Sequence, residues 1–427
     1  MGFYCRPSGS THCKFSESLT HNQKKMIKNN SFILKSIHSL INWIEQNDYS
    51  SYDHYDFWSS KIGIVGRRIF SMNKLIGMPI VAFLNSLDVC LPQSRKIFAM
   101  KDRSAEAIPR IAMGYFRLYQ MTNEMNYLNL GCKLLGWLKE NASNTEHGCG
   151  WGLHFDWEGK VFVKKGTPCV TLTAYATEAF LEGHRLTKEE IYRETAEKTG
   201  EFVACDLNRK VMSYGIALSY TPTNQNYVIN ANSYAARILA SLMRENSDDW
   251  MKRELVEKII NYIVTQQNSD GSWFYFDRDD VQENRNFIDS FHTCFVLENL
   301  YWIWKWNKSE NLKKSIDKGY EFFIKQFITT DHSVRYYYYY PYPNGIKVDI
   351  RGCAETIYCL TLLSDLYPEA INLARKVAKW TINNMQDKKG FFYFRTYRTH
   401  RNKFPYIRWG QAPMFNALTF LLSKLTS

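Results

Sequence analysis

The feature that most constrains the fold is a repeat of about sixty residues. Six segments carry apolar side chains at helical spacing, and each closes on a leucine: Leu118, Leu181, Leu242, Leu300, Leu362 and Leu421. Successive leucines are 63, 61, 58, 62 and 59 residues apart. A period of this length is typical of stacked supersecondary units. The 427 residues are therefore expected to form one repetitive unit rather than two or three separate domains.

Two kinds of helical segment alternate. One kind is rich in apolar and small residues and spans 103–118, 170–181, 229–242, 288–300, 349–362 and 407–421. The other carries more Lys and Glu and spans 31–47, 126–141, 188–205, 250–267, 310–327 and 367–385. The first kind should be covered on most sides, and the second on one side only. We predict an all-α, closed (α/α)6 toroid of six hairpins with the first kind inside, because neither end has the polar capping repeat of an open solenoid.

The toroid is predicted to occupy residues 31–427 as a single domain, preceded by a polar segment at 1–30. Residues 48–102 break the period, and we expect an irregular insertion that either packs over the mouth of the ring or closes it. No secretory signal is recognisable in the first thirty residues. The longest apolar run is about half of the ~20 residues that span a bilayer. We therefore expect a soluble cytoplasmic protein without a transmembrane segment.

Short aromatic segments follow the outer helices, at 150–157, 214–220, 271–277, 334–341 and 390–395. Their composition predicts short strands or extended loops. Each precedes an inner helix, so in a toroid they gather on one face together with the positive ends of the inner helices. Aromatic platforms beside polar groups suit sugar rings. The predicted substrate-binding residues on this face are Trp151, His154, Asp156, Asn230, Asn232, Trp273, Tyr336, Tyr338, Arg351, Arg398, Arg408, Trp409 and Gln411.

Charge favours an anionic partner, since 54 Lys and Arg outnumber 42 Asp and Glu. Nucleic acid, phosphate, a uronate sugar and a membrane face all satisfy this sign. The last loop is the most basic stretch, and its Arg398 and Arg408 suit bidentate contact with a carboxylate or phosphate. A solvated basic loop is the simpler alternative.

Asp289 and His292 are the predicted catalytic pair. They lie three residues apart at the start of an inner segment, on one face of a helix, and supply a carboxylate and an imidazole for acid–base chemistry. The alternative is an N-cap aspartate beside a histidine that has no role in catalysis. Further along the inner segments, Arg110, Arg237, Glu298 and Glu355 are expected to form buried ion pairs.

No cofactor or metal is expected. The chain has no GxxxxGK[ST] loop and no strand-borne GxGxxG, which disfavours ATP and NAD chemistry. The ten cysteines form no CxxC pair and are expected to be reduced. His147, Cys149, His154 and Asp156 lie close in sequence, but this spacing is a weak zinc signal.

The hairpin period and the aromatic-then-helix unit resemble the (α/α)6 toroid enzymes of carbohydrate metabolism over residues 100–427. These include unsaturated glucuronyl hydrolases, uronyl C5-epimerases and sugar 2-epimerases. The segment FIDSFHTCFVLENL, with Asp289, is similar to the hydrolase segment that carries a catalytic aspartate. The resemblance implies an enzyme that acts on a uronate-containing glycan or glycoside, in surface polysaccharide metabolism among other settings. Epimerisation, elimination and hydrolysis are all open, and a glycan rather than nucleic acid is the expected partner.

Two alternatives remain. Residues 267–273 match the Q-x3-G-x-W repeat of terpenoid cyclases and protein prenyltransferases, 386–392 nearly match it, and 277–280 spell DxDD. The DxDD motif lies about ten residues before the inner helix, and such cyclases generally need a second barrel. The other alternative is a non-catalytic glycan-binding toroid, whose affinity would not depend on Asp289 or His292.

Overall fold

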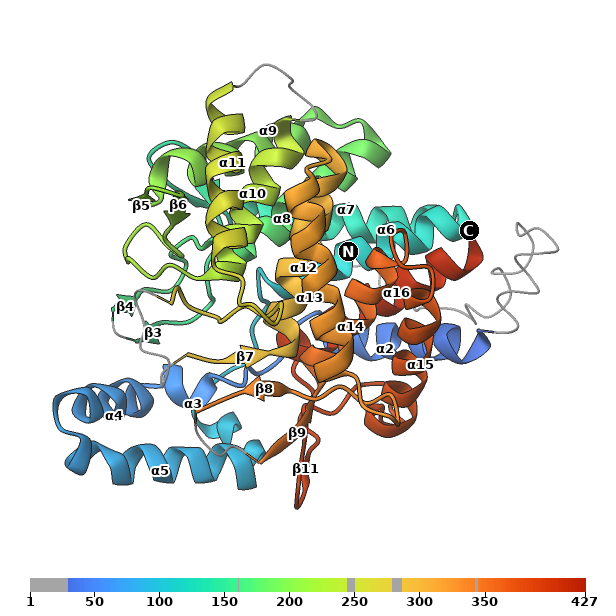
Figure 1. The fold of residues 1–427 in the computed structure, drawn as a ribbon. Helices are drawn as coiled ribbons and strands as arrows, with labels where there is room; N and C mark the ends of the chain where they lie inside the picture. The colour runs from blue at the N-terminus through green and yellow to red at the C-terminus, as the bar shows by residue number, and fades with distance from the viewer. Residues whose placement is uncertain (1–29, 160, 244–249, 279–285, 342–344) are drawn as a thin grey trace, which may run out of the picture.

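A computed structural model describes residues 30–427 except 160, 244–249, 279–285 and 342–344. The inner helices are α6 (Ala107–Thr122), α8 (Val170–Thr187), α10 (Ile229–Met243), α12 (Ser290–Asn307), α14 (Ile350–Leu363) and α16 (Ala412–Thr426). The outer helices are α2 (Ser31–Gln46), α7 (Met125–Glu140), α9 (Glu190–Glu201), α11 (Trp250–Thr265), α13 (Glu310–Phe327) and α15 (Ala370–Met385). Both sets match the predicted segments (Figure 1).

The ring is closed. Each inner helix packs against the next one, and α16 returns to pack against α6. The last contact is close: a Cβ on Gly114 of α6 would lie 2.3 Å from the ring of Phe415 on α16. The inner helices form the core, and in α14 every residue is buried. The predicted (α/α)6 toroid is confirmed.

Two glycine turns that follow outer helices pack against the next outer helix of the ring. The turn after α11 places Gly271 at φ +95°, where a Cβ would lie 2.3 Å from the carbonyl oxygen of Lys318 on α13. The turn after α15 places Gly390 at φ +99°, with a Cβ 2.1 Å from the carbonyl oxygen of Ser39 on α2. This conformation and this spacing admit only glycine. Because the turn after α15 packs against α2, the ring of outer helices is closed as well.

Short antiparallel strands lie between the helices, as predicted, although the aromatic segment 271–277 is an extended loop with one isolated bridge from Phe276 to Val228. The strands are β1 (Ser143–Asn144), β2 (Cys149–Gly150), β3 (Trp157–Glu158), β4 (Phe162–Val163), β5 (Arg209–Met212), β6 (Gly215–Leu218), β7 (Ile288–Asp289), β8 (Tyr337–Tyr339), β9 (Ile346–Asp349), β10 (Arg395–Tyr397) and β11 (Arg401–Asn402). The two-stranded sheets pair β1 with β2, β3 with β4, β5 with β6 and β7 with β8, and β10 lies between β9 and β11. Two π-helical turns complete the list of elements: Phe202–Asp206 follows α9, and Ile407–Gln411 precedes α16.

The insertion has two parts, and its base is closed by a bridge between Ser51 and Asp102. Its first part, with α3 (Asp56–Ser59), packs over the mouth. Its second part is a helical hairpin of α4 (Lys61–Met72) and α5 (Lys74–Cys90), followed by a 3-10 turn (Pro92–Ile97), and it projects from the ring (Figure 1). Residues 1–29 of the predicted polar segment lie outside the described residues. In the described part of the chain, a helix that could span a membrane is not found.

Candidate functional site

The mouth of the toroid brings the predicted catalytic pair together. Asp289 caps α12, and its Oδ1 accepts a hydrogen bond from the backbone N–H of His292 at 2.9 Å. Its Oδ2 lies 2.7 Å from Nδ1 of His292. Asp289 is buried, whereas the His292 side chain is 19% exposed. This contact orients the imidazole, with Nδ1 toward Asp289 and Nε2 on the other side of the ring.

Aromatic rings surround His292. Its ring centroid lies 4.4 Å from that of Tyr275 and 3.9 Å from that of Phe291. Phe291 in turn stacks on Tyr336 at 6.0 Å and meets Trp409 edge-on at 5.5 Å. His292 is thus a polar group in an apolar wall, and two predicted platforms, Tyr336 and Trp409, belong to the same wall.

The insertion adds a second histidine that the sequence did not single out. The ring of His54 lies 4.2 Å from that of Trp409 and 6.0 Å from that of Tyr406. Burial lowers the pKa of His54 well below its usual value. The carboxylate of Asp53 acts to raise this pKa, and the positive charge of Arg408 offsets part of that effect. His54 is therefore neutral near pH 7. His54 was not predicted from the sequence because it lies in the insertion, where the repeat is interrupted. No equivalent residue in the other repeats indicates a role for it.

Beneath the mouth, Arg351 and Arg408 are held by buried carboxylates. Arg408 donates from Nη1 to Glu106 at 2.7 Å and from Nη2 to Asp53 at 2.8 Å. Arg351 pairs with Glu106 at 2.7 Å and with Glu355 at 2.6 Å. Although burial opposes ionisation, the arginines hold the pKa of Asp53 well below its usual range and lower the pKa of Glu106 to about 2.

Inner ion pairs form the floor of this network, but the prediction was wrong for Glu298, which has no ion pair among the described residues because burial raises its pKa well above the usual value. Arg110 pairs with Glu355 at 2.5 Å, and Arg237 pairs with Glu178 at 3.0 Å. A cavity of about 20 Å³ lies among these residues in the centre of the ring. It has room for about one water molecule and none for a sugar. Together, Arg110, Arg351 and Arg408 balance Asp53, Glu106 and Glu355 in charge.

Four predicted substrate-binding residues anchor the aromatic turns instead of reaching the mouth. Trp151 donates from Nε1 to the carbonyl of Leu138 at 2.9 Å, and Trp273 makes the equivalent bond to Ile263 at 3.0 Å. Asn232 exchanges two hydrogen bonds with the backbone of Leu218, and Gln411 does the same with Phe392. All four are buried. Their recurrence in the repeat thus has a structural cause.

The other predicted residues are more dispersed. His154 lies beside Phe155 at 4.8 Å, and its Nδ1 is buried without a hydrogen-bond partner among the described residues. Asn230 likewise leaves Oδ1 unpartnered within the described part of the chain. Asp156 accepts a hydrogen bond from the backbone N–H of Lys165 at 2.7 Å. Tyr338 and Arg398 are exposed, at strand β8 and just after β10.

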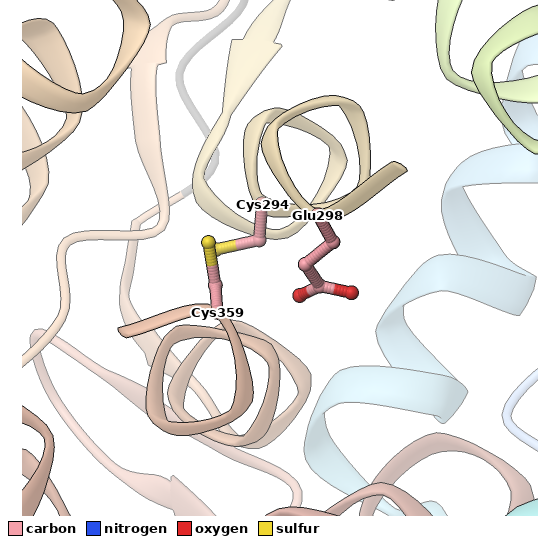
Figure 2. Close-up of side chains that lie close together, drawn as sticks. All are labelled: Cys294, Glu298 and Cys359. Atoms are coloured by element: carbon pink, nitrogen blue, oxygen red, sulfur yellow. The ribbon is translucent and has the colours of Figure 1, made fainter. Parts of the chain in front are cut away.

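Among the residues that the structure describes, two clusters offer three potential metal ligands each. Cys294 and Glu298 of α12 face Cys359 of α14 in the core (Figure 2). Burial raises the pKa of Cys294 and of Glu298 well above their usual values, so both hold protons and a cation would have to displace them. The second cluster joins His147 to Glu146 and Asp206 near the surface. Cys149, His154 and Asp156 are not part of it.

The terpenoid-like motifs have structural roles. Gln267 donates from Nε2 to the carbonyls of Gly271 at 2.9 Å and Ser315 at 3.0 Å, which ties α11 to α13. Gln386 makes the same contacts with Gly390 and Ser36. Asp277 is buried and accepts a hydrogen bond from Tyr262 at 3.2 Å, while positions 279 and 280 lie outside the described residues. The repeat likeness therefore reflects how the barrel is built.

A groove of about 530 Å³ lies outside the ring, between α2, the 3-10 turn and β11. Its lining joins aromatic and basic side chains: Trp43, Tyr52, Phe391 and Phe404, with Lys96, Lys101, Arg401 and Lys403. Asp387 is the one acidic residue of the lining. Phe404 separates the groove from the mouth, since it stacks on Tyr406 at 4.8 Å. The sequence pointed to this basic loop but not to the walls contributed by α2.

Structural comparison finds toroid enzymes of sugar metabolism. The chain is similar to cellobiose 2-epimerase from Bacillus thermoamylovorans B4167, with 14% identity, a TM-score of 0.59, and coverage of 76% of this chain and 87% of that chain. It is also similar to a D-mannose isomerase, with 13% identity, a TM-score of 0.58, and coverage of 75% of this chain and 87% of that chain. An unsaturated glucuronyl hydrolase specific for heparin matches at 10% identity and a TM-score of 0.55, over 74% and 85% of the two chains. The resemblance to the (α/α)6 toroid enzymes is confirmed at the level of the fold.

The sequence itself matches no family model and no curated protein sequence. What the mouth does must therefore be argued from its own residues.

Proposed function

We propose that this protein is a carbohydrate-processing enzyme that moves a proton on a sugar through His292. The observation that carries the proposal is the hydrogen bond between Asp289 Oδ2 and His292 Nδ1 in the aromatic mouth. The fold shared with sugar epimerases, isomerases and hydrolases supports the substrate class. An aromatic wall that holds an oriented histidine suits a sugar ring, whose faces are apolar and whose edges carry hydroxyls.

The chemistry of the site favours proton transfer over hydrolysis. Nε2 of His292 would take a proton from the carbon next to a carbonyl or carboxylate, while Asp289 orients the ring and stabilises the imidazolium. Hydrolysis needs two available carboxyl groups around the bond. Here Asp53 and Glu106 are committed to Arg408, and Asp349 is committed to Arg395 and Trp409. Epimerisation, isomerisation and elimination share the first step and are the proposed reaction classes.

The substrate we propose is anionic. The charge of Arg408 is already neutralised by two carboxylates, so a uronate group would gain little from it. The groove lined by Arg401 and Lys403 offers cations at the surface beside aromatic rings, and Phe404 of its lining stacks on Tyr406 at 4.8 Å. A uronate-containing oligosaccharide could place its reacting sugar in the mouth and an acidic neighbour in the groove.

A screen in heavy water tests the reaction class. The protein is incubated with neutral aldoses and with uronate-containing oligosaccharides, and products are followed by mass and by ultraviolet absorbance. Epimerisation or isomerisation should incorporate solvent deuterium at carbon, and elimination should yield an absorbing unsaturated product. Cleavage with neither signal would mean hydrolysis. Binding without turnover, unchanged in Asp289→Asn, would favour the non-catalytic glycan-binding toroid.

Replacing Arg401 and Lys403 with alanine tests the groove. The double variant should lose affinity for an acidic oligosaccharide by roughly tenfold or more, because two charge-assisted contacts disappear. Affinity for a neutral oligosaccharide of the same length should change by less than about twofold. The matched control is Lys388→Ala with Lys389→Ala, which removes the same charge from the neighbouring exposed turn. Equal losses for the acidic and the neutral ligand would contradict the assignment.

A further inference from the structure

We propose that the α4–α5 hairpin docks the protein on the surface of an anionic lipid membrane. The hairpin exposes an unusual number of large apolar side chains, with exposed fractions between 52% and 88%. They are Ile62, Val65, Met72, Leu75, Ile76, Met78 and Phe83. In a soluble protein such side chains are normally scattered singly, and a contiguous set marks an interaction surface. The inference does not depend on whether the mouth is catalytic.

The hairpin is built so that these seven side chains face outward, while Leu84 is buried. Its helices meet through glycines: a Cβ on Gly66 would lie 2.8 Å from Cγ2 of Ile80, and one on Gly77 would lie 2.2 Å from Cα of Phe70. Small residues at the contact let the two backbones approach closely, as in helix pairs that face lipid. The apolar side chains are then available to a partner instead of forming an internal core.

Charge selects the partner. Between residues 57 and 87 the chain has four basic residues, Lys61, Arg67, Arg68 and Lys74, and no Asp or Glu. Lys61 and Lys74 are exposed without a carboxylate beside them in the hairpin sequence, Arg68 is exposed but pairs with Glu158 at 3.0 Å, and Arg67 is half-buried at the base. Exposed cations beside an apolar face are the composition of helices that lie in the interface of anionic membranes. A second copy of the chain would bring the same cations against each other, on a molecule that already carries a formal charge of +12. The helices have 12 and 17 residues, fewer than the ~20 that span a bilayer, so the hairpin would lie in the plane of the interface.

The base of the hairpin is tied firmly to the mouth. Arg95 is fully buried, pairs with Asp88 at the end of α5 and donates to the backbone carbonyl of Asp53. On the other helix, Arg67 donates to the carbonyl of Glu158 at 2.8 Å and lies 4.0 Å over the ring of Trp157. Docking through the hairpin would therefore hold the mouth beside the lipid surface. A glycan attached to a lipid could be presented there.

Vesicle co-sedimentation tests the proposal with the full-length protein. The probes are vesicles of equal parts phosphatidylglycerol and phosphatidylcholine, and vesicles of phosphatidylcholine alone. Wild type should bind the anionic vesicles, and the variant with Leu75→Ser, Ile76→Ser and Phe83→Ser should bind them at least about tenfold more weakly. The matched control, Val211→Ser with Met251→Ser, removes exposed apolar side chains from another part of the surface and should bind like wild type. Circular dichroism melts confirm that each variant is folded.

Three results would overturn the proposal. Wild type could fail to bind anionic vesicles, or it could bind neutral vesicles equally well, which would remove the role of charge. Analytical ultracentrifugation could instead show a dimer that the triple serine variant abolishes, and the hairpin would then be a contact between copies of this chain.

Discussion

At the scale of single residues, an arginine can bind an anionic substrate only if carboxylates of the protein do not already neutralise its charge. Arg408 looked like a carboxylate receptor in the sequence, since it lies in a basic stretch before an inner helix. Its partners, Asp53 and Glu106, come from more than 300 residues away, and nothing local in the sequence indicates them. By contrast, the Asp289–His292 pair is local, and its helical spacing was enough to predict its geometry.

Arg408→Ala should therefore destabilise the fold more than it affects uronate binding. It would leave two buried carboxylates without their partner, at a cost of about 3–5 kcal/mol in the free energy of unfolding. Urea unfolding measures this cost. A loss below about 1 kcal/mol would mean that the network does not hold the insertion in place.

The same network predicts a stability that falls in acid. The pKa of Glu106 is about 2 in the folded chain, against an ordinary value of 4.5. A depressed carboxylate contributes stability that is complete above the unfolded pKa and is lost as the pH falls through the folded one. The unfolding free energy should thus decrease between pH 4.5 and about 2, and Glu106→Gln should flatten this part of the profile. An unchanged slope in the variant would contradict the assignment.

At the scale of elements, the glycine turns set the spacing between outer helices. Gly271→Ala should destabilise the protein, because φ is positive and the carbonyl of Lys318 leaves no room for a methyl group. The control is Gly136→Ala in α7, where a Cβ meets nothing within 4 Å and should stabilise the helix by about 0.5–1 kcal/mol. Thermal melts of the two variants should shift in opposite directions. A tolerated Gly271→Ala would show that the turns do not fix the ring.

At the scale of the whole molecule, the sequence predicts the repeat well and the insertion poorly. Leucines about sixty residues apart and the alternation of helix types placed all twelve described helices of the ring, because each hairpin buries its apolar face in the same way. Residues 48–102 have no counterpart in the other repeats. His54 above the mouth and the exposed hairpin therefore became visible only when the chain was placed in three dimensions.

Solvent deuterium exchange in a histidine variant tests the central claim most directly. With a substrate that wild type turns over in heavy water, His292→Ala should lower carbon-bound deuterium incorporation, or unsaturated product, by ~10²-fold or more, since the base is gone. His147→Ala removes a histidine that is paired in the same way, with Asp206 at 2.5 Å, but lies outside the mouth, and its rate should match wild type. A His292→Ala rate within about threefold of wild type, far short of that loss, would contradict the account.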